Sequence, residues 1–229
     1  ESPIYREVIA ANAELTSLSM VQQALADGEL WLVYSIGDDA SYVVAIRHDS
    51  VRISELTVSD SSAESLGVAS GPLSASKLAE LMVQKTDSVY PMLSNRGDID
   101  KLTQKLSALW DVLIPDDEQT SLTAGDVSHL TVMPDNQLCL LPFETLVVTP
   151  GQGLEYLLDV GPPINYVPSA SVWNNLKDRN QSSVLQREPV LTLGDPAYPQ
   201  DQADPLDRIM GVDAAAKRYR ANVSPLPCS

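Results

Sequence analysis

Two cysteines and two histidines are the side chains of this 229-residue sequence that could form a cysteine–histidine catalytic pair: Cys139, Cys228, His48 and His129. Cysteine catalysis needs a thiolate, a histidine that generates and orients it, and hydrogen-bond donors for the oxyanion. His48 falls in a predicted hairpin turn, and His129 begins a predicted strand. Cys139 is interpreted as a small apolar residue on a buried strand, the commoner state of a free cysteine. Cys228 is a candidate exposed thiol with no histidine near it in the sequence, so no catalytic pair can be assigned.

Other catalytic patterns are missing from the sequence. It has no glycine-rich phosphate loop, no Gly-x-Ser-x-Gly elbow and no His/Cys/Asp cluster at metal-binding spacing. We therefore expect neither a cofactor nor a metal. The two cysteines do not form a disulfide framework, which favours a reducing, cytoplasmic location.

Composition and charge limit the classes of partner. Hydrophobic residues make up 44% of the chain, enough for a core, and 15 basic against 31 acidic residues give a net charge of −16. This charge repels phosphate backbones and disfavours nucleic acid. The basic cluster at Lys217, Arg218 and Arg220 is interpreted as a solvated helix face. No apolar run approaches the roughly 18 residues of a membrane span, and the first residues, which lack a methionine and a signal segment, suggest a piece of a longer polypeptide.

The stretch from His129 to Val148 organises the rest of the chain. Leu130–Met133 predicts a short buried strand, Pro134-Asp135-Asn136 a turn, and Leu138–Leu141 a second buried strand. Pro142 removes a backbone donor, so the second strand ends there or lies at an edge. Phe143, the only phenylalanine, follows.

This stretch resembles the signature of CHAT domains, which are caspase-like cysteine peptidases often attached to tetratricopeptide repeats. The similarity lies in Val-Met-Pro-Asp at 132–135 and Leu-Leu-Pro-Phe-Glu-Thr-Leu at 140–146, with Asn136 where the family usually has glycine and Cys139 where histidine is common. Three further runs are similar to family motifs: Tyr-Val-Pro-Ser-Ala-Ser at 166–171, Gly-Asp-Pro at 194–196 and Pro-Leu-Pro at 225–227. The resemblance covers roughly residues 15–227.

The expected fold is α/β, with a small antiparallel N-terminal sheet and helices packed on the first part of a caspase-like, mostly parallel sheet. Residues 1–97 would form an N-terminal subdomain of a helix and a three-strand meander, and residues 98–229 the first part of the caspase-like core, both within one CHAT-type domain. Turn residues between alternating β-formers place the meander strands at Leu30–Ile36, Tyr42–Arg47 and Val51–Val58.

Helix signals complete the expected element order. The clearest helix starts after Asp98, a good N-cap, keeps its apolar residues on one face, and stops at Pro115. The other expected elements are a helix over 2–16, a helix capped by Ser17 or Ser19 and ending at Gly28, a serine-rich loop over 59–70, a helix over 73–84, a linker over 88–97, a strand from Ile164 leading to a helix capped by Ser169, and a strand over 190–193.

The resemblance also implies where the chemistry should lie. In CHAT domains the histidine lies in a Thr-His-Gly-like turn and the cysteine in a Ser-Ala-Cys-like run, and this sequence contains neither. The chain is therefore predicted to be the large non-dyad portion of a caspase-like cysteine endopeptidase that cleaves a protein target. Its catalytic His and Cys are expected on a segment beyond Ser229, so this chain alone should be inactive. The expected partners are a protein substrate, a second chain or segment that carries the dyad, and a helical repeat region. The alternative is a non-catalytic protein-binding scaffold.

Asp195 is the candidate substrate-pocket residue. It would follow a central strand at the edge where open α/β sheets present ligands. In caspase-like peptidases the loop after this strand lines the primary substrate pocket, so an acid there would favour a basic side chain before the scissile bond through a bidentate Asp–Arg contact. The competing interpretation is a turn, with Asp195 bonding its own backbone before Pro196.

Overall fold

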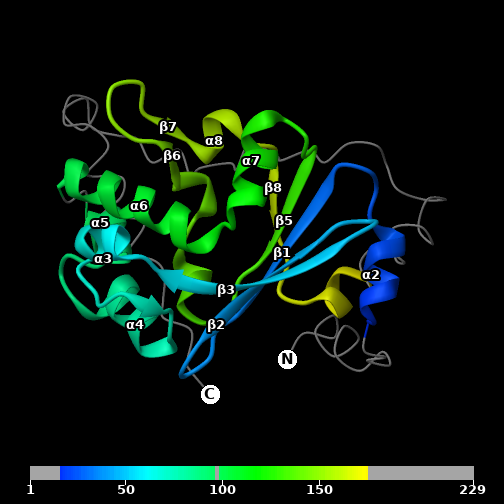
Figure 1. The fold of residues 1–229 in the computed structure, drawn as a ribbon, viewed down its shortest axis with the longest axis horizontal. Helices are drawn as coiled ribbons and strands as arrows, with labels where there is room; N and C mark the ends of the chain where they lie inside the picture. The colour runs from blue at the N-terminus through cyan, green and yellow to red at the C-terminus, as the bar shows by residue number, and fades with distance from the viewer. Residues whose placement is uncertain (1–15, 96–97, 175–229) are drawn as a thin grey trace, which may run out of the picture. The chain divides into compact units, whose positions relative to one another are not determined.

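The computed structural model describes residues 16–95 and 98–174. The chain divides into two compact units, Glu1–Leu185 and Gln186–Ser229, and every described residue belongs to the first. This part combines a six-stranded sheet, a two-stranded sheet and helices (Figure 1). The predicted α/β class is confirmed. The helix predicted over 2–16 lies outside the described residues, and the subdomain boundary at residue 97 stays a prediction.

The predicted three-strand meander is present. Strands β1 (Glu29–Ser35), β2 (Ser41–Ile46) and β3 (Val51–Val58) pair antiparallel in chain order. The turn between β1 and β2 requires glycine at position 37, because a Cβ there would collide with the carbonyl oxygen of Ala40. A short strand, β4 (Gly71–Pro72), pairs with the far end of β3.

Two parallel strands continue the same sheet on the other side of β1. β5 (His129–Met133) pairs parallel with β1, and β8 (Ile164–Tyr166) pairs parallel with β5. The strand order is β4-β3-β2-β1-β5-β8, so the antiparallel meander and the parallel strands share one sheet. The carboxyl ends of β1, β5 and β8 therefore lie at the same edge.

The sheet has a core on each face. On one face, Leu30, Leu32 and Tyr34 of β1 belong to the larger cluster, which includes the buried side of helix α6 (Ile99–Leu113). On the other face, Trp31 packs with Val21 and Leu25 from the short helix α2 (Leu18–Ala24), whose N-cap is Ser17 as predicted. Helix α2 ends at Ala24, four residues before Gly28.

The best-predicted helix is α6 (Ile99–Leu113). The Asp98 side chain accepts a hydrogen bond from the Lys101 backbone N–H at 3.1 Å, the predicted N-cap, and the helix ends before Pro115. The apolar face is buried at Leu106, Leu109, Trp110 and Leu113, whereas Ile99 at the start of the helix is 69% exposed. A second helix, α7 (Asp116–Ala124), begins directly after Pro115 and has three acidic residues in its first turn.

Two segments expected to be irregular are helical, so those predictions were wrong. The serine-rich segment contains α3 (Asp60–Leu66), because Ser59 accepts from the Ser62 backbone N–H and Leu66 is buried. The expected linker contains α5 (Val89–Asn95), whose Val89 and Met92 are buried and whose proline lies in the first turn, where a missing N–H costs little. The helix predicted over 73–84 is present as α4 (Ala75–Ala79) followed by a π-helical turn, Glu80–Gln84.

The predicted second strand of the central stretch was wrong as well. Residues Asn136–Leu140 form a 3₁₀ helix, η2, followed by a 3₁₀ turn, η3 (Phe143–Thr145). Leu138 and Leu141 are both buried, and their spacing of three residues matches one turn of a 3₁₀ helix. In the sequence, the same short apolar run also fits a buried strand. The elements after it are β6 (Val147–Thr149), β7 (Glu155–Tyr156) and α8 (Leu157–Val160).

Candidate functional site

The register of the sheet separates the candidate cysteine from both described histidines. Trp31 of β1 pairs with Ile46 of β2 and with Thr131 of β5, so the turn that carries His48 and the start of β5 at His129 lie at one end of the sheet. Cys139 follows the other end of β5. The four steps from His129 to Met133 span about 13 Å at ~3.3 Å per residue. These residues therefore do not form a catalytic dyad.

Cys139 also differs from its predicted environment. It is exposed and lies in η2, where its Sγ is 3.8 Å from the Pro134 carbonyl oxygen. The prediction of a buried strand cysteine was wrong, because the 3₁₀ helix turns this residue away from the core. His48 is also exposed, with Nδ1 4.0 Å from Asp27 Oδ1.

The turn Pro134-Asp135-Asn136 follows β5 and is hydrogen-bonded to the residue that follows the parallel strand β1. Asp135 Oδ2 accepts a hydrogen bond from the Ile36 backbone N–H, just after β1, at 2.8 Å. Asn136 has φ +54°, the left-handed region that asparagine and glycine tolerate best. The glycine that CHAT signatures usually carry at this position is thus explained by backbone geometry, and asparagine satisfies the same requirement.

Phe143 is the packing centre of a group of residues at the carboxyl ends of β1, β5 and β8. We call this group the carboxyl-end corner; it consists of Ile36, Asp135, Asn136, Phe143, Glu144 and Tyr166. The Phe143 ring is fully buried, with centroids 5.4 Å from the Tyr34 ring and 6.3 Å from the Tyr166 ring. Tyr34 comes from β1 and Tyr166 from β8. The phenylalanine therefore connects the signature to strands on either side of β5.

Tyr166 fixes the corner with two hydrogen bonds. Its hydroxyl donates to Glu144 Oε2 at 2.6 Å and accepts from the Phe143 backbone N–H at 2.8 Å. Burial, followed by the hydrogen bond to Glu144, raises the pKa of Tyr166 well above its ordinary value, so the hydroxyl stays protonated and can donate. This role was not predicted from the sequence, because only the parallel pairing of β5 with β8 brings Tyr166 to the signature.

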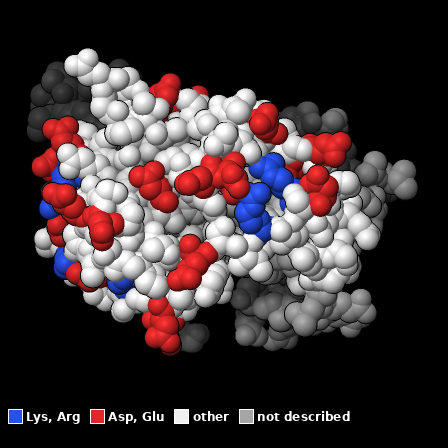
Figure 2. Space-filling model, viewed as in Figure 1, with Lys and Arg blue, Asp and Glu red and all other residues white. Residues whose placement is uncertain are grey.

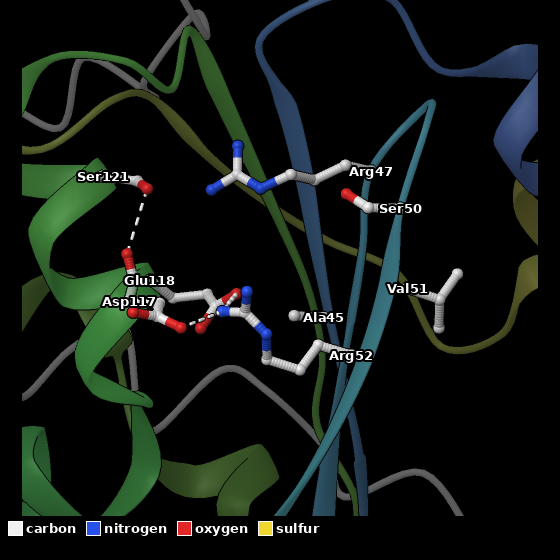
Figure 3. Close-up of a pocket in the computed structure, with 8 residues that line it drawn as sticks. All are labelled: Ala45, Arg47, Ser50, Val51, Arg52, Asp117, Glu118 and Ser121. Atoms are coloured by element: carbon white, nitrogen blue, oxygen red, sulfur yellow. Dashed lines mark hydrogen bonds and ion pairs between the residues drawn. The ribbon is translucent and has the colours of Figure 1, made fainter.

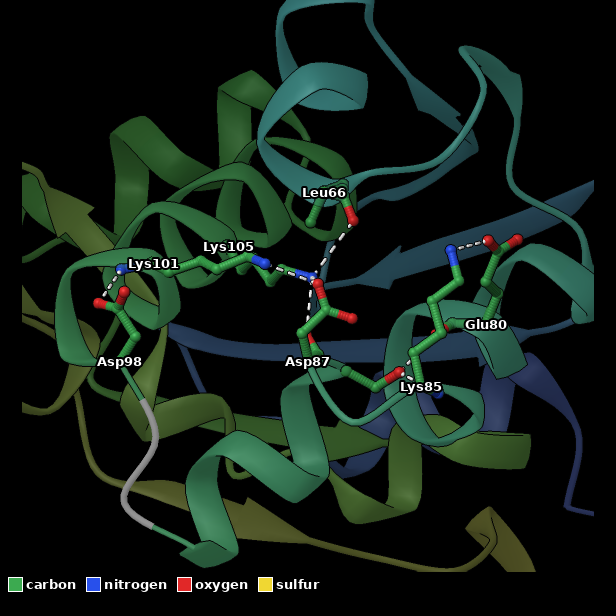
Figure 4. A network of polar contacts seen from close by, with 8 residues as sticks. Leu66, Glu80, Lys85, Asp87, Asp98, Lys101 and Lys105 are labelled. Carbon is green, nitrogen blue, oxygen red and sulfur yellow. Dashed lines mark hydrogen bonds and ion pairs between the residues drawn. The ribbon is translucent and has the colours of Figure 1, made fainter.

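A buried lysine holds α6 against the helices before it (Figure 4). Lys105 Nζ donates to the Asp87 carbonyl oxygen at 2.8 Å and lies 3.5 Å from the Leu66 carbonyl oxygen. Lys101 Nζ donates to Asp87 Oδ2 at 2.7 Å, and this bond, together with the charge of Lys105, lowers the pKa of Asp87. Burial lowers the pKa of Lys105. This network is structural, because its donors are used by backbone carbonyls and by Asp87.

The remaining predicted site residues fall elsewhere. Ser169 accepts from the Val172 backbone N–H at 3.2 Å, as predicted for a helix cap at the end of the β8 segment. Asp195, Cys228, the strand over 190–193 and the basic cluster at 217–220 lie outside the described residues. Within residues 16–95 and 98–174, no group of three or more His, Cys, Asp or Glu side chains could hold a metal ion.

The described surface carries the acidic character of the sequence. Figure 2 shows acidic side chains spread over the face in view, with fewer basic ones among them, in keeping with the net charge of −16. None of the helices in the described ranges has the length and hydropathy needed to cross a bilayer.

Comparison with known proteins identifies the family. The family model of the CHAT domain matches residues 103–228, more than half of the chain, and this range contains most of α6, β5, the signature turn, Phe143 and β8. No curated protein and no solved structure matches the chain. The chain therefore belongs to the CHAT-domain family of caspase-like peptidases.

Proposed function

We propose that this chain is the large portion of a CHAT-type cysteine endopeptidase, acting on a protein target together with a segment that carries the catalytic His and Cys. One observation carries the proposal: the CHAT match contains every residue of the carboxyl-end corner except Ile36, while the register of the sheet keeps Cys139 a strand's length from His48 and His129. The portion would thus supply the frame of the active centre and none of its nucleophilic chemistry.

The corner suits such a frame. Ligands of open α/β sheets bind beyond the carboxyl ends of the strands, and Asp135, Phe143 and Tyr166 lock three of those ends together by hydrogen bonds and ring packing. Catalytic groups must be held to within about 0.5 Å by well-packed supports. A corner in which the Asp135 and Tyr166 side chains are hydrogen-bonded and the central ring is fully buried suits that demand.

Asp195 would provide substrate selection in this proposal. If it follows a strand of the caspase-like core, its carboxylate would pair with an arginine or lysine side chain before the scissile bond, arginine being favoured by bidentate geometry. The competing role, a turn before Pro196, predicts no effect on substrate choice. These two roles are separated by substrate profiling.

A scaffold role is the second candidate, and one surface favours it. Tyr42, Val51 and Ile53 lie on one face of the β2–β3 pair and are 41%, 37% and 68% exposed. Neighbouring apolar side chains on an exposed sheet face are a common feature of protein-binding surfaces. In that role the chain would bind a helical repeat region or a target protein without cleaving it, and a cytoplasmic location would suit both roles.

Native mass spectrometry of the chain purified from its source tests the proposal. We expect a second, smaller polypeptide with Thr-His-Gly-like and Ser-Ala-Cys-like runs, cleavage of a peptide library by the complex, and no cleavage by the isolated chain. Asp195→Asn should lower kcat/KM for arginine substrates at least about tenfold, while Asp201→Asn, an equal charge change nearby, should not. Cleavage by the isolated chain would refute the proposal, and a stable complex without cleavage would favour the scaffold.

A further inference from the structure

A pocket of about 160 Å³ lies between the β2–β3 hairpin and α7 (Figure 3). Arg47 and Arg52 line it from the hairpin side, and Asp117, Glu118 and Ser121 from the helix side. It adjoins the end of β2, at the opposite end of the sheet from the carboxyl-end corner. Pockets for drug-sized molecules occupy about 300–1,000 Å³. This one is therefore suited to a group the size of one polar side chain.

Glu118 leaves one buried oxygen without a donor. Arg52 Nη1 forms ion pairs with Asp117 and, at 3.4 Å, with Glu118 Oε1. The Glu118 side chain is only 4% exposed, and its Oε2 has no hydrogen-bond partner among the described residues. A buried acceptor without a donor destabilises the fold because its desolvation is not compensated, so a ligand that donates to this oxygen would remove that penalty.

Arg47 brings donors to the same space. Both backbone polar groups of Arg47 are hydrogen-bonded. The N–H donates to the Ser50 carbonyl oxygen at 2.9 Å, and the carbonyl oxygen accepts from Gln22 Nε2 at 3.2 Å. Figure 3 shows the Arg47 guanidinium reaching from the hairpin toward α7, above the Arg52 ion pairs. In the described part of the chain no acceptor pairs with this guanidinium.

The charges of the pocket select a neutral ligand. Two arginines face two acidic side chains, so a bound cation would meet Arg47 and Arg52, and a bound anion would meet Asp117 and Glu118. The ligand must also donate to Glu118 Oε2 and accept from Arg47. A primary carboxamide does both, since its NH₂ is a donor and its C=O is an acceptor. We propose that this pocket binds a primary carboxamide, such as the side-chain amide of glutamine or asparagine.

The test is an NMR titration of the full chain with N-acetyl-glutamine N-methylamide and, separately, with free glutamine. We expect saturable shifts in residues of the hairpin and of α7, with dissociation constants in the millimolar range expected for so small a group. Stronger binding of the capped form points to a side chain of a protein partner. Stronger binding of the free amino acid points to a small-molecule source. Either result supports the carboxamide site.

Matched ligands and variants make the proposal refutable. Arg47→Met should weaken binding about tenfold or more, and Ser121→Leu should block the pocket. Lys85→Met and Thr123→Leu, which make similar changes outside it, should leave binding unchanged, and thermal unfolding should show all four variants folded. Equal or tighter binding of the N-acetyl-glutamate or N-acetyl-arginine N-methylamides would overturn the assignment. Absence of saturable shifts with both carboxamide probes would overturn it too, leaving water as the partner of Glu118.

Discussion

Replacing Tyr166 by phenylalanine tests whether the carboxyl-end corner is held by hydrogen bonds or by packing alone. The change keeps the ring that lies against Phe143 and removes the hydroxyl. It deletes the 2.6 Å bond to Glu144 Oε2 and leaves the Phe143 backbone N–H without its 2.8 Å acceptor. Both consequences destabilise the corner, and the ring contact should survive.

The expected loss is about 1.5–2.5 kcal/mol in the free energy of unfolding. A hydrogen bond to a charged group contributes about 1.5–3 kcal/mol, and an orphaned buried donor costs about 1–3 kcal/mol. Tyr166 is 43% exposed, so water can reach part of the site and replace some of the lost bonding. The estimate therefore lies well below the sum of the two contributions.

Urea unfolding monitored by circular dichroism measures this loss. The midpoint should fall while the denaturant slope stays constant, because the change removes an interaction without altering the surface exposed on unfolding. Tyr42→Phe is the matched control: Tyr42 is 41% exposed on β2 of the same sheet, and its hydroxyl makes no hydrogen bond within the described structure. Its loss should stay within about 0.5 kcal/mol.

Equal effects of the two substitutions would refute the reasoning. If Tyr166→Phe cost no more than Tyr42→Phe, the hydroxyl bonds to Glu144 and Phe143 would contribute nothing net, and the corner would be held by ring packing and backbone pairing. A double-mutant cycle with Glu144→Gln would then show no coupling. Coupling of about 1 kcal/mol or more would place the bond between these two side chains in the folded state in solution.

Three further outcomes follow from the same structure. Phe143→Ala should cost about 3–5 kcal/mol by emptying the centre of the corner, whereas Leu140→Ala, at a 39% exposed position, should cost several-fold less in the same urea assay. Asn136→Ala should lower stability by about 1–2 kcal/mol because φ is +54°, and Asn136→Gly should not. Burial lowers the pKa of Lys105, so above its folded pKa the unfolded chain binds more protons than the folded one. Stability should therefore rise from that pKa toward pH 10.5 relative to Lys105→Met, and a fall over this range would contradict the burial of a charged lysine.

Local patterns accounted for much of the fold. The Asp98 cap, the apolar face of α6 and the turns of the meander all depend on residues a few positions apart, which is the range over which helix capping, periodicity and turn chemistry act. Local patterns gave a wrong prediction where one pattern is compatible with two kinds of secondary structure. Apolar residues at 138 and 141 fit a buried strand and a 3₁₀ helix equally well, and the folded chain forms the helix.

The sequence by itself determined the family, because the Pro-Asp and Leu-Pro-Phe-Glu motifs at 134–144 consist of consecutive residues and can be recognised without the structure. Tertiary structure alone decided what those motifs do. Asp135 bonds a residue 99 positions away, Glu144 one 22 positions away, and Arg52 reaches Glu118 across 66 positions. Such contacts arise from the register of parallel strands and from helix packing, which no local pattern encodes. The corner and the carboxamide pocket are therefore visible only once the sheet is assembled.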